Sequence, residues 1–142
     1  MGIVEKLVYR RRSKLARAVL SFMFGIDCPA EVRVGEGLTL VHRGRGTVIY
    51  PLTTLGKNVR IYHQVTLGRK DAHLPIEQSK MERLVIGDDV VIFPGAKVLG
   101  GDGTTSIGNG TIIAANAVLM SSTGPNEIWA GIPARRVGLR TD

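Results

Sequence analysis

Residues 86–97 read IGDDVV-IFPGAK, two consecutive six-residue units that each begin with isoleucine. The same beat recurs on both sides of them, in units that begin with an aliphatic residue at positions 55, 61, 67, 98, 107, 113 and 119. A period of six is neither the 3.6 of a helix nor the 2 of a half-buried strand. It fits a short strand and a tight turn, repeated and stacked. The sequence therefore predicts a mainly β chain that folds as a parallel β-helix.

The composition agrees with a narrow solenoid. Hydrophobic residues make up 44% of the 142 residues but aromatic residues only 5%, and a narrow interior accepts Val, Ile and Leu more readily than rings. The 18 glycines suit corners that need a positive φ or a close approach of coils. At this length we expect one solenoid, residues 27–142 with a basic C-terminal tail, preceded by a helical segment at residues 1–26.

Positive charge is concentrated near the two ends of the chain. The net charge is +7, and much of it lies between Lys6 and Arg17 and again between Arg135 and Arg140. No basic patch interleaved with aromatic residues accompanies it, so we do not expect a nucleic-acid partner. Residues 2–24 are predicted to form one helix that caps the end of the solenoid. Contact of this basic helix with an anionic membrane or a lipid-linked substrate is the alternative.

An apolar run, AVLSFMFGI, follows the basic segment at residues 18–26. It is short, is interrupted by Ser21 and Gly25, and leads into Asp27 rather than into a small-residue cleavage site. We therefore expect neither a secretory signal nor a transmembrane span. The single cysteine, Cys28, excludes an internal disulfide. These features favour a cytoplasmic protein, with membrane association left open by the basic helix.

The repeat also predicts which residues share a face. If three units make one coil of a triangular prism, the units that begin at positions 40, 61, 92 and 113 stack. This count allows for a three-residue insertion in each of the segments 40–49 and 98–107 and for a longer excursion at residues 69–83. The third residues of these units are, in order, His42, His63, Pro94 and Ala115. Stacked strands lie about 4.8 Å apart. We therefore expect two histidines one coil apart, beside small residues that leave room for a long, thin ligand.

The hexads, the segment VTLG at residues 65–68 and the ending AGIPAR at residues 130–135 resemble the hexapeptide-repeat acyltransferases. Similarity is greatest to the catalytic domain of serine acetyltransferases and to short sugar O-acetyltransferases. This resemblance implies a left-handed β-helix, an exception to the right-handed crossover rule. It also implies a homotrimer, with acetyl-CoA as co-substrate in a groove between subunits and no required metal.

The resemblance implies a catalytic pair. The segment GIDCPAEVRVGEGLTLVH at residues 25–42 places Asp27 fifteen residues before His42, the separation found in serine acetyltransferases. In that family the histidine takes the proton from the acceptor hydroxyl, a role that suits an imidazole at neutral pH. The aspartate orients the ring and stabilises the imidazolium.

The resemblance also implies the residues that contact acetyl-CoA. In chain order, they are Gly68, Arg69, Pro94, Ala115, Arg135 and Arg136. The first two would offer a backbone amide to the thioester oxygen, and the middle two would line the path of the pantetheine arm. The two arginines would border the nucleotide end, where a guanidinium meets phosphate well. Trp129 is expected to pack on the end of the solenoid.

Three departures from serine acetyltransferases lie at the acceptor end. Val41 stands where that family has an acid directly before its histidine. Glu82 and Arg83 stand where it has an Arg-His pair that binds the amino-acid carboxylate, and its large helical N-terminal domain is missing from this sequence. These departures favour a hydroxyl of a sugar or polysaccharide precursor, free or lipid-linked, over L-serine.

A polar excursion at residues 69–83, RKDAHLPIEQSKMER, interrupts the repeat. Long loops inside a regular repeat are more often functional than accidental. We expect this loop, with His63 and Arg83, to line the acceptor pocket.

Three alternatives stay open. The first is serine O-acetylation. The second is a γ-class carbonic anhydrase, which uses this fold with three zinc-bound histidines; the chain has three histidines, His42, His63 and His73. The third is a non-catalytic scaffold, since fold alone does not prove activity. The spacing of Asp27 and His42 argues against the scaffold.

Overall fold

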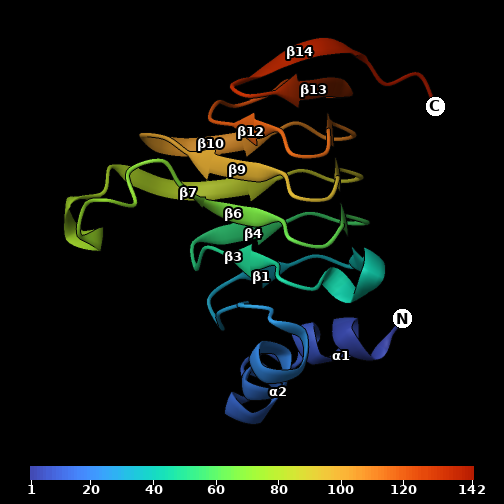
Figure 1. Ribbon diagram of the computed structural model, residues 1–142, viewed down its shortest axis with the longest axis vertical. Coiled ribbons are helices and arrows are strands. Elements are labelled where there is room, and N and C mark those ends of the chain that lie inside the picture. The colour runs from blue at the N-terminus through green and yellow to red at the C-terminus, as the bar shows by residue number, and fades with distance from the viewer.

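The computed structural model describes residues 1–142, and most of the chain winds as a stack of coils around one long axis (Figure 1). Three sheets form the walls of a triangular prism. The first wall contains β1 (Arg33–Val34), β4 (Thr53–Leu55), β7 (Met81–Ile86) and β10 (Gly103–Ile107). The third wall contains β3 (Val48–Ile49), β6 (Thr66–Arg69), β9 (Lys97–Gly100) and β12 (Val118–Leu119).

The second wall has six strands. They are β2 (Thr39–Leu40), β5 (Arg60–Ile61), β8 (Val91–Ile92), β11 (Ile112–Ile113), β13 (Glu127–Gly131) and β14 (Ala134–Leu139). Every pairing in the three walls is parallel except the one between β13 and β14, which closes the upper end. The chain is thus the left-handed parallel β-helix that the sequence predicted.

The residue that begins each six-residue unit fills the prism interior. Ile61, Ile92 and Ile113 are fully buried and pair in register from one coil to the next. Leu40 pairs with Ile61 in the same way. This register confirms that the units beginning at positions 40, 61, 92 and 113 share one face. Each interior side chain packs on the coils above and below it.

The corner between the first and second walls requires glycine. A Cβ on Gly35 would lie 2.5 Å from the Gly56 carbonyl oxygen, and one on Gly56 would lie 2.7 Å from the Gly87 carbonyl carbon. Both neighbours are backbone, which cannot move aside while the coils stay paired. Glycine at these positions therefore sets how closely the coils stack.

The N-terminal segment forms two helices, so the prediction of one helix over residues 2–24 is wrong. The helices are α1 (Ile3–Tyr9) and α2 (Lys14–Phe24). The Ser13 hydroxyl accepts a hydrogen bond from the Ala16 N–H at 3.4 Å and so caps α2. Between the helices, the Arg11 side chain donates to the Val32 carbonyl at 2.8 Å. The cap that starts α2 and the contact of Arg11 with the solenoid together explain why α1 ends instead of continuing as one long helix.

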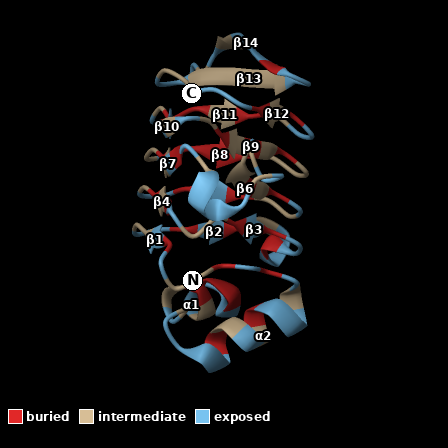
Figure 2. Cartoon of the chain, turned by 90° about the vertical axis from the view of Figure 1, so that its left-hand side faces the viewer, coloured by how far each residue is buried: buried red, intermediate tan, exposed pale blue.

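The two helices, called the helical cap below, cover the lower end of the prism (Figures 1 and 2). Val4, Val8 and Leu20 are buried in the same core as the first coils. The Glu5 carboxylate accepts a hydrogen bond from the Leu40 N–H at 2.9 Å. The Tyr9 hydroxyl donates to the Gly35 carbonyl at 2.7 Å. The cap therefore satisfies both apolar and polar groups of the first coil.

At the upper end, Trp129 lies opposite Ile113 in the neighbouring strand and packs against the core, as expected. Its indole Nε1 donates to the Glu127 carboxylate at 2.8 Å. That hydrogen bond, with further contributions from the Gly124 N–H and Arg136, holds the pKa of Glu127 below its ordinary value against the opposing effect of burial.

The excursion is a loop at residues 70–80 that contains the short helix η2 (Ile76–Gln78) and projects from the prism (Figure 1). It is shorter than predicted, because β7 already includes residues 81–83. Asp71 organises its base. The Arg69 guanidinium donates to the Asp71 carboxylate at 3.1 Å, and so does the Ser79 hydroxyl. Burial pushes the pKa of Asp71 upward, but these hydrogen bonds outweigh it and the pKa lies below its ordinary value.

Candidate functional site

His42 lies at the corner between the second and third walls, in a short helical turn, η1 (Val41–Gly44). The three-residue insertion predicted within residues 40–49 forms this turn. His42 and Arg43 have φ values of 53° and 62°, in the left-handed region. Residues other than glycine rarely adopt this backbone conformation, and those that do cluster at functional sites. The turn leaves the His42 side chain exposed.

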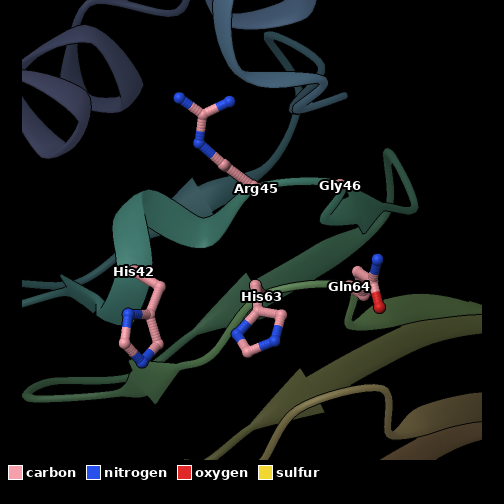
Figure 3. A pocket seen from close by; sticks show the side chains of 5 residues that line it. All are labelled: His42, Arg45, Gly46, His63 and Gln64. Atoms are coloured by element: carbon pink, nitrogen blue, oxygen red, sulfur yellow. The ribbon is translucent and has the colours of Figure 1, made fainter.

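His42 and His63 lie next to each other at this corner. Their ring centroids are 5.3 Å apart and the rings meet edge to face at 82° (Figure 3). Together with Arg45, Gly46 and Gln64 they line a pocket of about 420 Å³. The prediction of two histidines one coil apart is thereby confirmed. No acidic side chain lines the pocket.

One polar atom in the pocket wall lacks a partner. The Nδ1 atom of His63 is buried and makes no hydrogen bond. Leaving a buried polar atom unpaired costs about 1–3 kcal/mol, and such atoms are rare in folded proteins. His63 is thus a pocket residue whose hydrogen bonding is incomplete within the chain.

The corner column, defined as His42, His63, Pro94 and Ala115, is continuous in the structure. The Gly95 N–H donates to the His63 carbonyl at 3.1 Å, and the Asn116 N–H donates to the Pro94 carbonyl at 3.0 Å. These bonds place each member one coil above the last. Pro94 is half-buried and Ala115 is exposed. The column above the two histidines therefore presents only short side chains.

Asp27 lies one coil below β3, where it forms a parallel bridge with Val48, and it is not among the residues that line the pocket. Its N–H donates to the Thr47 carbonyl at 3.0 Å, and its carbonyl accepts from the Ile49 N–H at 2.8 Å. Asp27 and His42 are both exposed, and no hydrogen bond joins their side chains. The catalytic pairing of the two residues stays a prediction.

Three predicted site residues lie away from the pocket within one chain. Gly68 and Arg69 end β6 at the base of the loop, and Arg83 lies in the first wall, where it donates to the Thr54 hydroxyl at 3.1 Å. The Arg69 guanidinium is already bonded to loop atoms, including the Leu74 carbonyl at 2.7 Å. Figure 1 shows the loop and η1 projecting from opposite sides of the coil. These residues do not share a pocket with His42 of the same chain.

Arg135 and Arg136 lie near the far end of the prism from His42. Both are exposed on β14, where they pair with Ala130 and Trp129 of β13. Five strand steps in the second wall separate β2 from β14, which corresponds to roughly 24 Å. A ligand that reached from His42 to these arginines would have to be long and extended.

Sequence reasoning missed three residues of the pocket, Arg45, Gly46 and Gln64. Each lies where the chain turns from the corner column into the third wall. The Gln64 N–H donates to the Arg45 carbonyl at 2.7 Å, and Gly46 and Gln64 have φ values of 74° and 56°. Their position in the turns just after the two histidines is the sequence signal that could have identified them.

Two further observations concern the carbonic anhydrase alternative and a membrane-spanning helix. His73 is exposed in the loop, and no group of three or more His, Cys, Asp or Glu side chains in the chain is arranged to hold a metal ion. Neither helix of the cap has the length and apolar character needed to cross a bilayer.

Cys28 is expected to be chemically inert in the native protein. Its side chain is buried, and this burial raises the pKa of the thiol to about 11, although Arg11 opposes the shift. The thiolate is the reactive form, and at pH 8 it would make up about one part in a thousand. We expect an aromatic disulfide reagent to modify Cys28 only after unfolding in urea. Rapid modification of the folded protein at pH 8 would contradict this burial.

No protein-family model matches the chain. A serine acetyltransferase from Helicobacter pylori (strain J99 / ATCC 700824) is 34% identical to it over 130 residues, which make up 92% of this chain and 68% of that protein. The solved serine acetyltransferase of Neisseria gonorrhoeae in complex with serine matches with a TM-score of 0.73 and 34% identity, over 96% of this chain and 53% of that one. The solved serine acetyltransferase from Brucella abortus strain S19 in complex with coenzyme A matches with a TM-score of 0.72 and 30% identity. The match covers 97% of this chain and 53% of that one.

The chain spans about half the length of these solved proteins and between 40% and 61% of the length of other curated relatives. Within the chain, however, the similarity covers nearly every residue, from the helical cap to the terminal hairpin. It is seen both in sequence and in three dimensions, and it confirms the resemblance drawn from the repeats and from the spacing of Asp27 and His42. The chain belongs to the serine acetyltransferase family.

Proposed function

We propose that the chain transfers the acetyl group of acetyl-CoA to the hydroxyl of L-serine, with His42 as general base. The observation that carries the proposal is the pocket in which His42 and His63 meet, at the foot of a column of short side chains. The relatives that hold serine and coenzyme A support this choice of acceptor and donor. Because the relatives compared above are serine acetyltransferases, serine replaces the sugar that the sequence departures favoured.

In the proposed reaction, His42 accepts the proton of the serine hydroxyl while the hydroxyl oxygen attacks the carbonyl carbon of the thioester. The carbon–sulfur bond then breaks, and the departing thiolate takes the proton back from His42. Histidine suits both transfers because it gains and loses a proton near neutral pH. Asp27 would orient the His42 ring, a role supported by its fifteen-residue spacing from His42.

The corner column would hold the pantetheine arm. Pro94 and Ala115 place short side chains above the histidines, and the Lys97 ammonium group reaches the Gly95 carbonyl beside them at 2.6 Å. Phosphate groups at the far end of such a ligand would meet the exposed arginines Arg135 and Arg136, which could bind them by charge and by paired hydrogen bonds.

A complete site would require a second copy of the chain. Gly68 and Arg69 end β6, which leads into the loop at residues 70–80, and this loop projects from the side of the coil opposite η1 (Figure 1). In a homotrimer, a neighbour would present this side to the His42 corner. The backbone amide of Gly68 or Arg69 would then come from that neighbour and stabilise the thioester oxygen.

A sugar hydroxyl is the second candidate acceptor, and the surroundings of Arg83 are the reason to keep it. Arg83, at the position of the family's carboxylate-binding pair, donates to Thr54 in the first wall. Glu82 beside it is exposed. If serine binds, its carboxylate therefore needs other partners, and His63 and Arg45 in the pocket wall are available.

The experiment that separates these acceptors measures free thiol released from acetyl-CoA. The reaction is run with L-serine, with D-serine as a matched control, with hexoses and N-acetylhexosamines, and without acceptor. We expect release that depends on L-serine. Release only with a sugar would assign the second candidate. Failure of every acceptor to raise the rate above the background would contradict acetyl transfer itself.

A further inference from the structure

α2 carries two apolar stripes, and the protein covers only one of them. The inner stripe includes Ala16 and Leu20, which are 5% and 0% exposed. The outer stripe follows the i, i+3, i+4, i+7 pattern of one helix face and consists of Leu15, Ala18, Val19 and Phe22. Leu15 is 74% exposed and Phe22 is 90% exposed.

This outer stripe is unusual for a helix that packs on a core. Such a helix buries its apolar face and turns polar residues to water, whereas here apolar residues extend around most of the helix. Met23, next to the stripe, is 57% exposed. Contiguous exposed apolar surface is uncommon on soluble proteins, and where it occurs it often marks an interaction site.

The segment of chain that carries the outer stripe is rich in positive charge. Residues 6–26 contain six basic residues and no acidic one. Arg11 and Arg17 use their guanidinium groups within the cap, since Arg11 donates to the Val32 carbonyl and Arg17 to the Arg11 carbonyl. The other four are exposed and take part in none of the ion pairs of the protein; they are Lys6, Arg10, Arg12 and Lys14.

The helical cap also occupies an accessible place. Figure 2 shows α2 across the base of the prism with exposed surface turned away from the coils. The corner column starts in the first coil and rises away from this end. A broad surface that met the base would therefore leave the upper part of the column open.

We propose that the outer stripe docks on an anionic lipid bilayer. Leu15 and Phe22 enter the boundary between headgroups and acyl chains, and the four free cations meet the lipid phosphates. Charge decides between a membrane and a second copy of the same face, because pairing two copies would bring basic residues against basic residues. This inference rests on the cap alone and not on the proposed acetyl transfer.

The test is co-sedimentation of the full chain with vesicles of phosphatidylcholine alone or mixed with phosphatidylglycerol. We expect binding to the anionic vesicles that weakens as salt is raised, and binding at least about tenfold weaker to the neutral ones. The double variant Leu15→Ser/Phe22→Ser is expected to bind anionic vesicles about tenfold more weakly. Leu139→Ser is the matched control, since Leu139 is 58% exposed at the other end of the prism, and it should bind as the parent does.

A second readout reports insertion directly. Phe22→Trp should give tryptophan emission that shifts to the blue when anionic vesicles are added. The parent protein supplies the baseline, because its single tryptophan, Trp129, lies at the far end. Absence of parent binding to anionic vesicles, or equal binding by the double variant, would overturn the proposal. A smaller assembly of the double variant in light scattering would also overturn it, by identifying the stripe as a contact between protein copies.

Discussion

His42→Ala is expected to lower kcat for acetyl transfer by roughly 10²–10⁴-fold, the usual contribution of a general base. The dissociation constant of CoA should stay within about twofold of the parent value, because the alanine removes no atom from the surface above the histidines. Steady-state kinetics and calorimetric titration with CoA measure the two quantities.

His42→Asn serves as the companion variant, since it keeps a polar side chain of similar reach but offers no base. Both variants should unfold at the parent temperature, because His42 is exposed and contributes little to the core. Retention of more than about a tenth of kcat by either variant would argue against base catalysis by His42. Loss of CoA binding would mean that the groove has been misplaced.

Ile113→Ala is expected to lower the free energy of unfolding by about 2–5 kcal/mol. Ile113 is fully buried and pairs with Ile92 in the coil below and with Trp129 in the strand above. The parallel ladders hold these coils about 4.8 Å apart, so the surrounding structure can collapse little into the space that the missing atoms leave. Urea unfolding followed by circular dichroism measures the change.

Ile112→Ala is the matched control, with the same residue type in the same strand. Ile112 is only partly buried, because alternate residues of a strand point to opposite faces. Its replacement should cost less than about 1 kcal/mol. Equal losses for the two variants would contradict the assignment of Ile113 to the prism interior.

Much of this structure follows from counting along the sequence. In a β-helix each strand pairs with the strand one coil earlier, so the register depends only on the number of residues per coil. Counting sixes, with two short insertions and the excursion at residues 69–83 set aside, was therefore enough to place His42 beside His63 and to continue the column through Pro94 and Ala115. The same reasoning placed Ile61, Ile92 and Ile113 in the core.

Other features depend on contacts that a period cannot encode. The break between α1 and α2 results from the Ser13 cap and from the bond between Arg11 and the Val32 carbonyl, which joins residues far apart in sequence. The pocket residues Arg45 and Gln64 meet because two corner turns stack, and neither has a motif of its own.

Counting along the sequence could not predict how Gly68 would come near His42. The two residues lie at different corners of one chain, so the register within the chain cannot bring them together. The acceptor raised a similar difficulty. Single substitutions such as Val41 favoured a sugar, whereas similarity over nearly the whole chain favours serine.

A crystal structure of the protein with CoA is the most direct test of whether the corner column is the groove that leads to His42. We expect the CoA sulfur beside the His42 ring, the pantetheine arm along Pro94 and Ala115, and the phosphates near Arg135 and Arg136. CoA bound instead in the second pocket of the chain, which is lined by Arg60 and Arg140 in a volume of about 220 Å³, with its sulfur remote from His42, would contradict this arrangement.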